Sequence, residues 1–225
     1  RQRRTQLLKL LAELHKPNRN INAIVVAEQG NTGEFNRGAV KNAGFEMAVC
    51  DLGLESTDTV VFHDVDVCPE STTFKAYPSC VPGVINHLYG HDHCLGGVVC
   101  VTVGDFRKMG MFAHWDYWGR EDVHLSNSAA DNGIDINRRN FTPRLGPKPG
   151  KPSRTDFFEM DMDGNRESVA SLRTQLTEKM AKRDSLFKDL KDKPELSQGP
   201  RFTKCVMGVV SPAPVLMRHY FVSGP

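Results

Sequence analysis

Apolar runs of strand length alternate with a helical pattern in this chain, and that order limits the folds open to it. Residues 21–27 form an apolar run, residues 58–67 contain the run Thr59-Val60-Val61-Phe62, and residues 35–49 between them place apolar side chains on one helical stripe. Two strands joined by a helix form a unit typical of α/β proteins with parallel strands. We therefore expect an α/β fold with a central, mostly parallel mixed sheet flanked by helices.

Further elements follow from the same kinds of pattern. Leucines at helical spacing predict a first helix at residues 4–15, and a β-branched run bounded by glycine predicts a strand at 96–103. Pro, Gly and Lys crowd residues 143–153 and predict an exposed loop. The remaining expected elements are short helices at 105–112 and 121–132, a strand at 157–160, a long charged helix at 166–193 and an edge hairpin of strands 202–210 and 214–222.

Length and composition favour one globular domain. The chain has 225 residues, 39% hydrophobic and 25% charged, which is enough for one sizeable core. We expect a single domain over 1–225, with a core in 1–140, a loop at 141–156 and a strand, helix and hairpin in 157–225. The net charge of +2 gives no field that favours nucleic acid or an anionic membrane.

Neither a membrane span nor a signal peptide is evident. No stretch approaches the roughly 20 apolar residues of a transmembrane helix. The first residues, Arg1-Gln2-Arg3-Arg4, lack a Met and a signal-peptide core. We interpret the chain as an excised domain.

Six cysteines leave two readings open. Their even number permits disulfides, and Cys68 and Cys80, which bracket a short polar loop, are the first pair to test. The alternative is six buried thiols that behave as small hydrophobic residues. No Cys-x-x-Cys pair occurs among positions 50, 68, 80, 94, 100 and 205, which argues against structural zinc.

Two carboxylates stand at the end of the second apolar run. Asp64 and Asp66, separated by Val65, are two residues apart and therefore project from one face of an extended strand. Ligands of open α/β sheets collect outside the carboxyl ends of strands, and paired hard oxygen donors there suit Mg²⁺ or Mn²⁺. The competing reading is an acidic turn without a ligand.

A second acidic pair follows an aromatic residue and a glycine. Glu121 and Asp122 come directly after Trp118, Gly119 and Arg120, at the expected start of a helix. Acids in a first helical turn can simply offset the macrodipole. A tryptophan beside them favours a sugar platform, because its ring face stacks on C–H groups while a carboxylate accepts a hydroxyl proton.

Four motifs in order resemble the beta-1,4-galactosyltransferase family. They are Phe35-Asn36-Arg37, Asp64-Val65-Asp66, Gly96-Gly97-Val98 and Trp118-Gly119-Arg120-Glu121-Asp122-Val123-His124-Leu125, and the last is most similar to the chondroitin N-acetylgalactosaminyltransferase branch. The resemblance covers residues 1–140 well and the remainder thinly. It implies a GT-A-like, inverting, Mn²⁺- or Mg²⁺-dependent transferase of galactose or N-acetylgalactosamine from a UDP-sugar to a glycan hydroxyl, with residues 1–140 as the nucleotide-sugar and acceptor core.

The resemblance also implies roles for single residues. Asp122 would be the general base, and Asp66 would bind the metal with Asp64 nearby. The acceptor would contact Trp118, Gly119, Arg120 and Glu121, with Glu121 positioning it. The donor would contact Arg1, Arg3, Phe35, Arg37, Asp64, Val65, Asp66, Gly97 and Trp118.

Three positions depart from the family's pattern. Arg120 stands where glycine is usual and puts a cation beside the base. No histidine follows in the usual third metal-ligand position, and the stretch Met160-Asp161-Met162-Asp163 corresponds to it. We therefore predict that Asp163, or failing that Asp161, replaces the histidine. Cys94 stands where the galactosyltransferases carry a tyrosine, which leaves room for an N-acetyl group on the donor.

Partners and alternatives complete the sequence-based expectations. The resemblance implies a UDP-sugar donor, a glycan acceptor and a Golgi-lumenal domain of a type II membrane protein, attached to the membrane only through an anchor outside this chain. An inactive nucleotide-sugar- or carbohydrate-binding module is one alternative, and a metal-dependent phosphohydrolase is another. We expect His63, His87 and His114 to have no chemical role.

Overall fold

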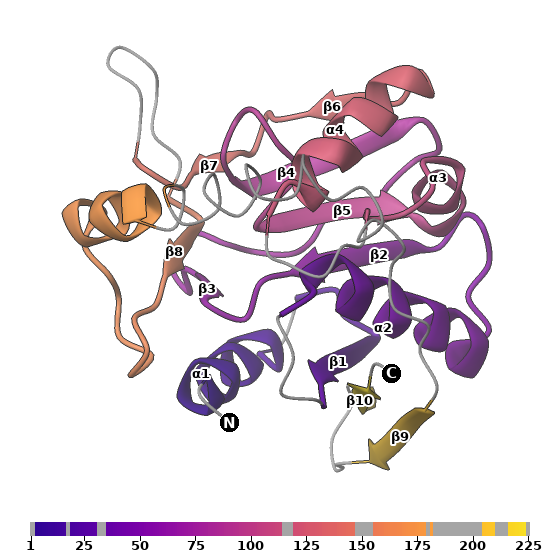
Figure 1. Cartoon of the computed structure of the whole chain (residues 1–225), viewed down its shortest axis with the longest axis horizontal. Helices are drawn as coiled ribbons and strands as arrows, with labels where there is room; N and C mark the ends of the chain where they lie inside the picture. Colours follow the sequence, from indigo (N-terminus) through magenta and orange to yellow (C-terminus); the bar gives the residue numbers. More distant parts are fainter. Residues whose placement is uncertain are drawn as a thin grey trace.

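The structure is a computed structural model, and it describes residues 3–16, 19–30, 35–113, 119–146, 155–178, 181, 204–209 and 216–223. Its main sheet has the strand order β2 (Thr59–His63), β5 (Val98–Thr102), β4 (Val84–Gly90), β6 (Asp135–Asn137), and β7 (Thr142–Pro143) also pairs with β4 (Figure 1). β5 is antiparallel to both neighbours, whereas β6 and β7 run parallel to β4. β5 and β4 are therefore the inner strands of this sheet.

Two smaller sheets lie beside the main one. β1 (Ala23–Gln29) pairs in parallel with β10 (Leu216–Ser223), which forms the predicted hairpin with β9 (Lys204–Val209). β3 (Val67–Pro69) is antiparallel to β8 (Phe157–Glu159). The α/β class and the mixed sheet are confirmed. The expected predominance of parallel pairing is wrong for the described strands, because β2 pairs with β5 and not with β1.

Each described helix lies at or near a predicted one, but α3 ends four residues before the predicted end. The structure has α1 (Arg4–Leu14), α2 (Arg37–Leu52), α3 (Val103–Lys108), α4 (Glu121–Asp131) and a further helix at 169–178, which begins three residues after the predicted start of the long charged helix. Asn36 caps the start of α2, where its side-chain oxygen accepts from the Ala39 N–H at 2.9 Å. The helix ends at Gly53, which has a φ of 63°. These caps fix the two ends of α2.

Two apolar clusters pack on opposite faces of the main sheet. All five residues of β5 are buried, and residues 98–101 alternate between the clusters. One cluster joins β5 to α2, α3 and α4 through residues such as Phe45, Phe106 and Leu125. The other joins it to α1 and the β3–β8 pair through residues such as Leu10 and Phe157. Full burial of each large apolar side chain stabilises the fold by roughly 1.5–3 kcal/mol.

Three observations complete the fold. β4 was not predicted from the sequence, since Pro78 and Pro82 precede it and its side chains include polar Asn86 and His87. Cys50, Cys68, Cys80, Cys94 and Cys100 are free thiols, so a Cys68–Cys80 disulfide is not seen. No helix among the described residues is long and apolar enough to cross a membrane.

Candidate functional site

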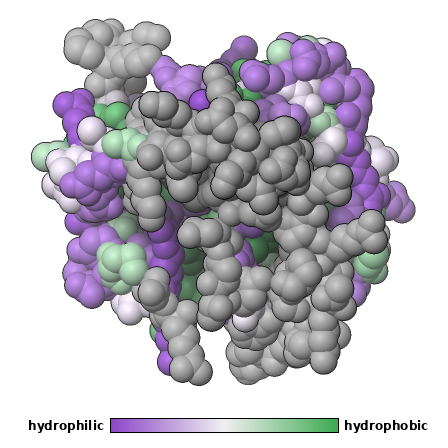
Figure 2. Space-filling view, viewed as in Figure 1, coloured by the Kyte–Doolittle hydropathy of each residue, from purple (hydrophilic) through white to green (hydrophobic). Residues whose placement is uncertain are grey.

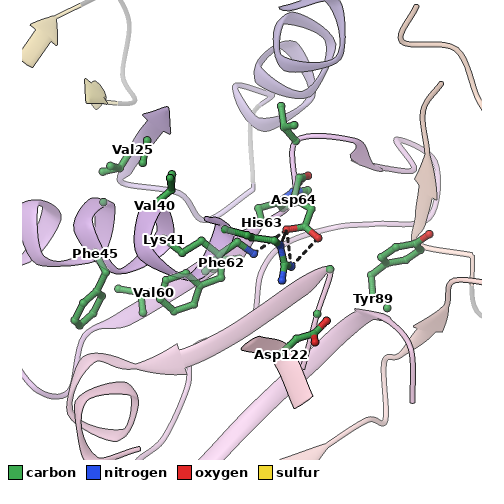
Figure 3. Close-up of a pocket in the computed structure, with 18 of the residues that line it drawn as sticks. Val25, Val40, Lys41, Phe45, Val60, Phe62, His63, Asp64, Tyr89 and Asp122 are labelled. Carbon is green, nitrogen blue, oxygen red and sulfur yellow. Dashed lines mark hydrogen bonds and ion pairs between the residues drawn. The ribbon is translucent and has the colours of Figure 1, made fainter. Parts of the chain in front are cut away.

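A cleft of about 1380 Å³ opens at the carboxyl end of β2. Its wall includes the first turns of α2 and α4, the loop between β4 and β5, and the facing sides of β1 and β2 (Figure 3). Apolar side chains line the part between the strands, and charged side chains gather at the strand end. In Figure 2 the coloured rim of the molecule is mainly hydrophilic, and apolar residues are visible in the central hollow. Both acidic motifs reach this cleft.

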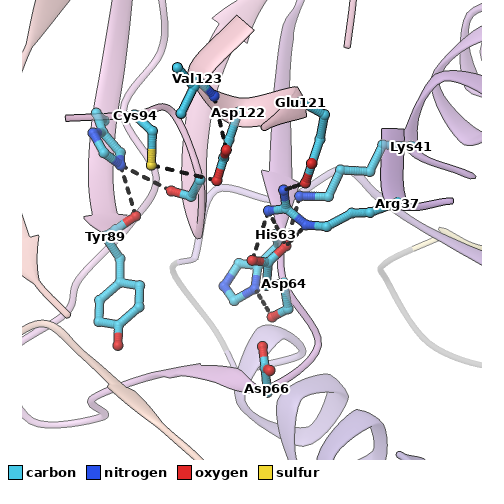
Figure 4. A network of polar contacts seen from close by, with 12 residues as sticks. Arg37, Lys41, His63, Asp64, Asp66, Tyr89, Cys94, Glu121, Asp122 and Val123 are labelled. Carbon is cyan, nitrogen blue, oxygen red and sulfur yellow. Dashed lines mark hydrogen bonds and ion pairs between the residues drawn. The ribbon is translucent and has the colours of Figure 1, made fainter. Parts of the chain in front are cut away.

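Asp64 is held by two cations from α2. Arg37, the first residue of that helix, donates from Nη2 to both carboxylate oxygens of Asp64, at 2.8 and 2.9 Å. Lys41 lies one turn later on the same helix face and donates from Nζ to Asp64 Oδ1 at 2.7 Å. The Asp64 carboxylate is therefore bound by a bidentate guanidinium and an ammonium group, both from α2 (Figure 4).

Arg37 and Lys41 stabilise the negative charge of Asp64. Burial alone would raise the pKa of Asp64, but Arg37 and Lys41 outweigh burial and hold that pKa far below its usual range. The pKa of Lys41 is lowered by burial and then by the neighbouring Arg37 cation. Asp64 is consequently an anion whose negative charge is already matched inside the protein.

Asp66 pairs with fewer protein cations than its partner in the motif. Its side chain is 20% exposed and forms an ion pair with Arg3, at 2.5 Å between Nη1 and Oδ2. Its backbone carbonyl accepts from the Met160 N–H at 2.8 Å, which ties the turn to the β8 segment. Asp66 therefore has one cationic partner where Asp64 has two, and the predicted division of roles between the two acids stays a prediction.

The second acidic pair meets the first through Arg37. Glu121 is buried and forms a close ion pair with Arg37 Nη1, so one guanidinium bridges Asp64 and Glu121. Asp122 follows in the first turn of α4, where the Val123 N–H donates to Oδ1 at 2.9 Å and the Cys94 thiol donates to Oδ2 at 3.5 Å. The acceptor contact expected of Glu121 stays a prediction, because its carboxylate faces Arg37.

The residues just before α4 have unusual backbone angles. Gly119 has a φ of 114° and Arg120 a φ of 68°. The left-handed region favours glycine, which gives a physical reason for the glycine that the resembling family carries at the Arg120 position. Arg120 is exposed at the cleft, and its acceptor role stays a prediction.

The other predicted donor contacts differ in how the structure places them. Phe35 is 49% exposed and lies at the cleft, as does Val65. The Gly97 carbonyl accepts from the Asp64 N–H at 3.1 Å, which joins the β5 entry to the Asp64 turn. Arg1 and Trp118 lie outside the described residues, so their roles remain predictions.

The two candidate replacement ligands do not line the cleft. Asp161 Oδ1 accepts from the N–H groups of Asp163 and Asn165, at 3.0 and 2.8 Å, so this carboxylate closes its own turn. Asp163 is exposed. Within the described part of the chain, no three His, Cys, Asp or Glu side chains gather closely enough to hold a metal. The geometry does not support the replacement-ligand prediction.

Sequence reasoning missed three charged residues of the cleft. Lys41 could have been found from its spacing of four from Arg37 on a helix. Glu159 and Arg144 form a partly buried ion pair at 2.7 Å, and both line the cleft. Burial raises the pKa of Glu159 to about 7, although Arg144 opposes that shift. No local pattern marks this pair, because β8 reaches the site by pairing with the distant β3.

Comparison with known proteins agrees with the motifs. The sequence model of a protein family, the N-terminal region of glycosyl transferase group 7, matches residues 1–80 of this chain. The beta-1,4-galactosyltransferases 5 of Sus scrofa and Homo sapiens are each 36% identical over 127 residues, 52% of this chain and 31% of theirs. The resemblance to the beta-1,4-galactosyltransferase family is confirmed. The matched segment spans about a third of these galactosyltransferases.

Solved galactosyltransferase structures show the fold over nearly the whole chain. A mutant of Drosophila beta-1,4-galactosyltransferase 7 in complex with manganese, UDP-Gal and xylobiose aligns with a TM-score of 0.60 at 18% identity, covering 99% of this chain and 90% of its own. The catalytic domain of the same enzyme with xylobiose gives 0.59 at 20% identity. The GT-A-like fold class predicted for this chain is thereby confirmed.

Proposed function

We propose that this chain is the catalytic domain of a metal-dependent, inverting glycosyltransferase, with residues 1–225 acting as one domain. It would move galactose or N-acetylgalactosamine from a UDP-sugar to a sugar hydroxyl of a glycan. The observation that carries the proposal is the bridge of Arg37 between Asp64 and Glu121, which brings the strand-end acids and the first turn of α4 into one cleft.

The chemistry assigned to Asp122 follows from its place. Its carboxylate stands at the cleft, at the start of α4, and it is not engaged by Arg37 as Glu121 is. In the proposed step Asp122 accepts the proton of the acceptor hydroxyl as that oxygen bonds to the anomeric carbon from the face opposite the diphosphate. The bond from that carbon to the diphosphate oxygen breaks with its electron pair, which gives UDP and a glycoside of inverted configuration.

The cations of the cleft suit a diphosphate. Arg3 and Arg37 lie beside the strand-end acids, and guanidinium groups bind phosphate oxygens well. Because Arg37 and Lys41 already neutralise the Asp64 carboxylate, Asp66 is the carboxylate that fits a divalent ion. Such an ion takes its other ligands from water and substrate phosphates, and when bound it would neutralise charge on the leaving diphosphate.

The finer specificity is proposed from the resemblance and from Cys94. The thiol of Cys94 lies beside Asp122, and the side chain is smaller than the tyrosine of galactosyltransferases at the corresponding place. This favours an N-acetylhexosamine donor. By the same resemblance we place the domain in the Golgi lumen, as part of a type II membrane protein.

Release of UDP in the presence of Mn²⁺ tests the proposal. The purified chain is incubated with UDP-Gal and UDP-GalNAc, each with and without a xyloside acceptor such as xylobiose, which a structural neighbour binds. Acceptor-dependent UDP release supports the transferase. Tight UDP binding without release from either donor would instead favour an inactive binding module, and acceptor-independent release in every condition would favour a hydrolase.

A further inference from the structure

His87 is completely buried in β4, with 0% of its surface exposed, and the proposed chemistry does not use it. Its Nδ1 lies 3.0 Å from Arg138 Nε, and its Nε2 lies 3.0 Å from both the Tyr89 and Gly96 carbonyl oxygens. An arginine Nε can only donate, so Nδ1 is the acceptor and the ring proton sits on Nε2. The neutral imidazole therefore donates to two backbone carbonyls on different segments.

The two segments meet too closely for ordinary side chains. A Cβ at Gly97 would lie 2.3 Å from the Tyr89 carbonyl oxygen, and one at Gly90 would lie 2.5 Å from the Gly96 carbonyl oxygen. The β4–β5 pairing also shifts register between His87 and Tyr89. The imidazole joins the end of β4 to the β5 entry at this irregular point.

Residues 94–97, which include the Gly96 carbonyl that accepts from His87, contact both Asp122 and Asp64. On the side of Asp122, the Leu95 N–H donates to the Asp122 carbonyl at 3.1 Å and the Cys94 thiol donates to Asp122 Oδ2. A Cβ at Gly96 would lie 2.7 Å from the same Oδ2, so the carboxylate rests against the Gly96 backbone. On the other side, the Gly97 carbonyl accepts from the Asp64 N–H.

We propose that His87 is a positioning residue, which fixes residues 94–97 through the Gly96 carbonyl and thereby sets the place of the Asp122 carboxylate. The inference rests on the function proposed above. Asp64 depends less on this support, because Arg37 and Lys41 grip its carboxylate independently. Loss of the imidazole donor consequently affects the chemical step more than donor binding.

Matched substitutions separate this role from simple packing. His87→Leu fills much of the volume without a donor, whereas the side-chain amide of His87→Gln keeps an N–H near the position of Nε2. Arg138→Met removes the group that fixes the ring tautomer, and Arg139→Met, at an exposed neighbour, is its control. These four variants and the wild type are compared in kcat and KM for the UDP-sugar.

We expect His87→Leu to lower kcat roughly 10- to 100-fold, as displacement of a catalytic group by about 1 Å does, while KM for the donor changes little. His87→Gln restores most of kcat, Arg138→Met lowers it, and Arg139→Met leaves it unchanged. Equal losses in His87→Leu and His87→Gln would overturn the proposal, since only packing would then matter. Unchanged kcat in His87→Leu would overturn it too.

Amide hydrogen exchange tests the same link without turnover. The Leu95 and Asp64 amides donate across the segment that His87 holds, so their exchange is expected to speed up in His87→Leu and to return towards wild type in His87→Gln. Should the wild type transfer no sugar, the proposed function fails while this readout still decides the role of His87. Unaltered exchange at both amides in His87→Leu would overturn the positioning role.

Discussion

Arg37 donates from one nitrogen to both carboxylate oxygens of Asp64, at 2.8 and 2.9 Å. The same guanidinium also pairs with Glu121 and is only 11% exposed. Arg37→Met leaves Glu121 without its buried partner and Asp64 with Lys41 alone, and breaking such a buried pair costs about 3–5 kcal/mol. We expect a large loss of unfolding free energy in chemical denaturation and a loss of UDP affinity in calorimetry.

Arg107 offers the matched control for that substitution. It pairs with Glu46 at 2.7 Å at an exposed position, where solvent screening leaves an ion pair little effect on stability. Arg107→Met should therefore leave stability and UDP affinity near wild type. Equal stability of Arg37→Met and Arg107→Met would show that the bridge between Asp64 and Glu121 does not stabilise the site.

Cys94 is expected to influence the choice of donor sugar. The side chain is 2% exposed and its thiol lies 3.5 Å from Asp122 Oδ2, so a larger residue changes the space beside the proposed base. Cys94→Tyr should shift the ratio of kcat/KM from the N-acetylated donor towards the plain sugar. Cys50→Tyr, at an exposed cysteine of α2, should not move that ratio. An unchanged ratio in Cys94→Tyr would remove Cys94 from donor selection.

Buried neutral histidine predicts a loss of stability in mild acid. Burial, followed by the adjacent Arg138 cation, lowers the pKa of His87 from 6.5 to about 4. Between these values the unfolded chain binds more protons than the folded one, so stability falls as pH drops through this window, by up to about 3 kcal/mol. His87→Gln should flatten the pH dependence seen in denaturation between pH 7.5 and 4.5. A slope identical to wild type would assign the acid sensitivity to other groups.

Metal dependence should follow Asp66. Chelation with EDTA is expected to stop transfer and added Mn²⁺ to restore it. Asp66→Asn should raise the Mn²⁺ concentration for half-maximal transfer by at least roughly 10-fold, since even outer-shell changes have effects of that size. Asp163→Ala is the comparison, because Asp163 is exposed and does not line the cleft. An equal shift in Asp163→Ala would show that Asp163 reaches the ion, as the sequence suggested.

Much of the site was predictable because its residues stand at the ends of elements with clear patterns. Asp64 and Asp66 follow a β-branched run, and Glu121 and Asp122 begin a helix, so their types and positions indicate where they lie. The β-branched run at residues 96–103 likewise predicted β5, because the pattern lies within the strand itself. Local periodicity decides such elements before any tertiary contact is considered.

The unpredicted parts depend on contacts between distant segments. Glu159 reaches the cleft only because β8 pairs with β3, and β4 is a strand although its residues include a buried His87. The sequence gives no sign of the structural contacts of His87, because its partners Gly96 and Arg138 lie on other segments. β1 pairs with β10 and not with β2, and β10 belongs to the far end of the chain.

The configuration of the product, measured with wild type and Asp122→Asn, tests the central claim most directly. Anomeric proton NMR of the glycoside formed from an α-linked UDP-sugar should show a β linkage for the wild type. Asp122→Asn should lower kcat roughly 10²- to 10⁴-fold without weakening UDP binding, and Asp131→Asn, at the exposed end of the same helix, should not. A retained α linkage, or full activity of Asp122→Asn, would contradict an inverting transfer with Asp122 as its base.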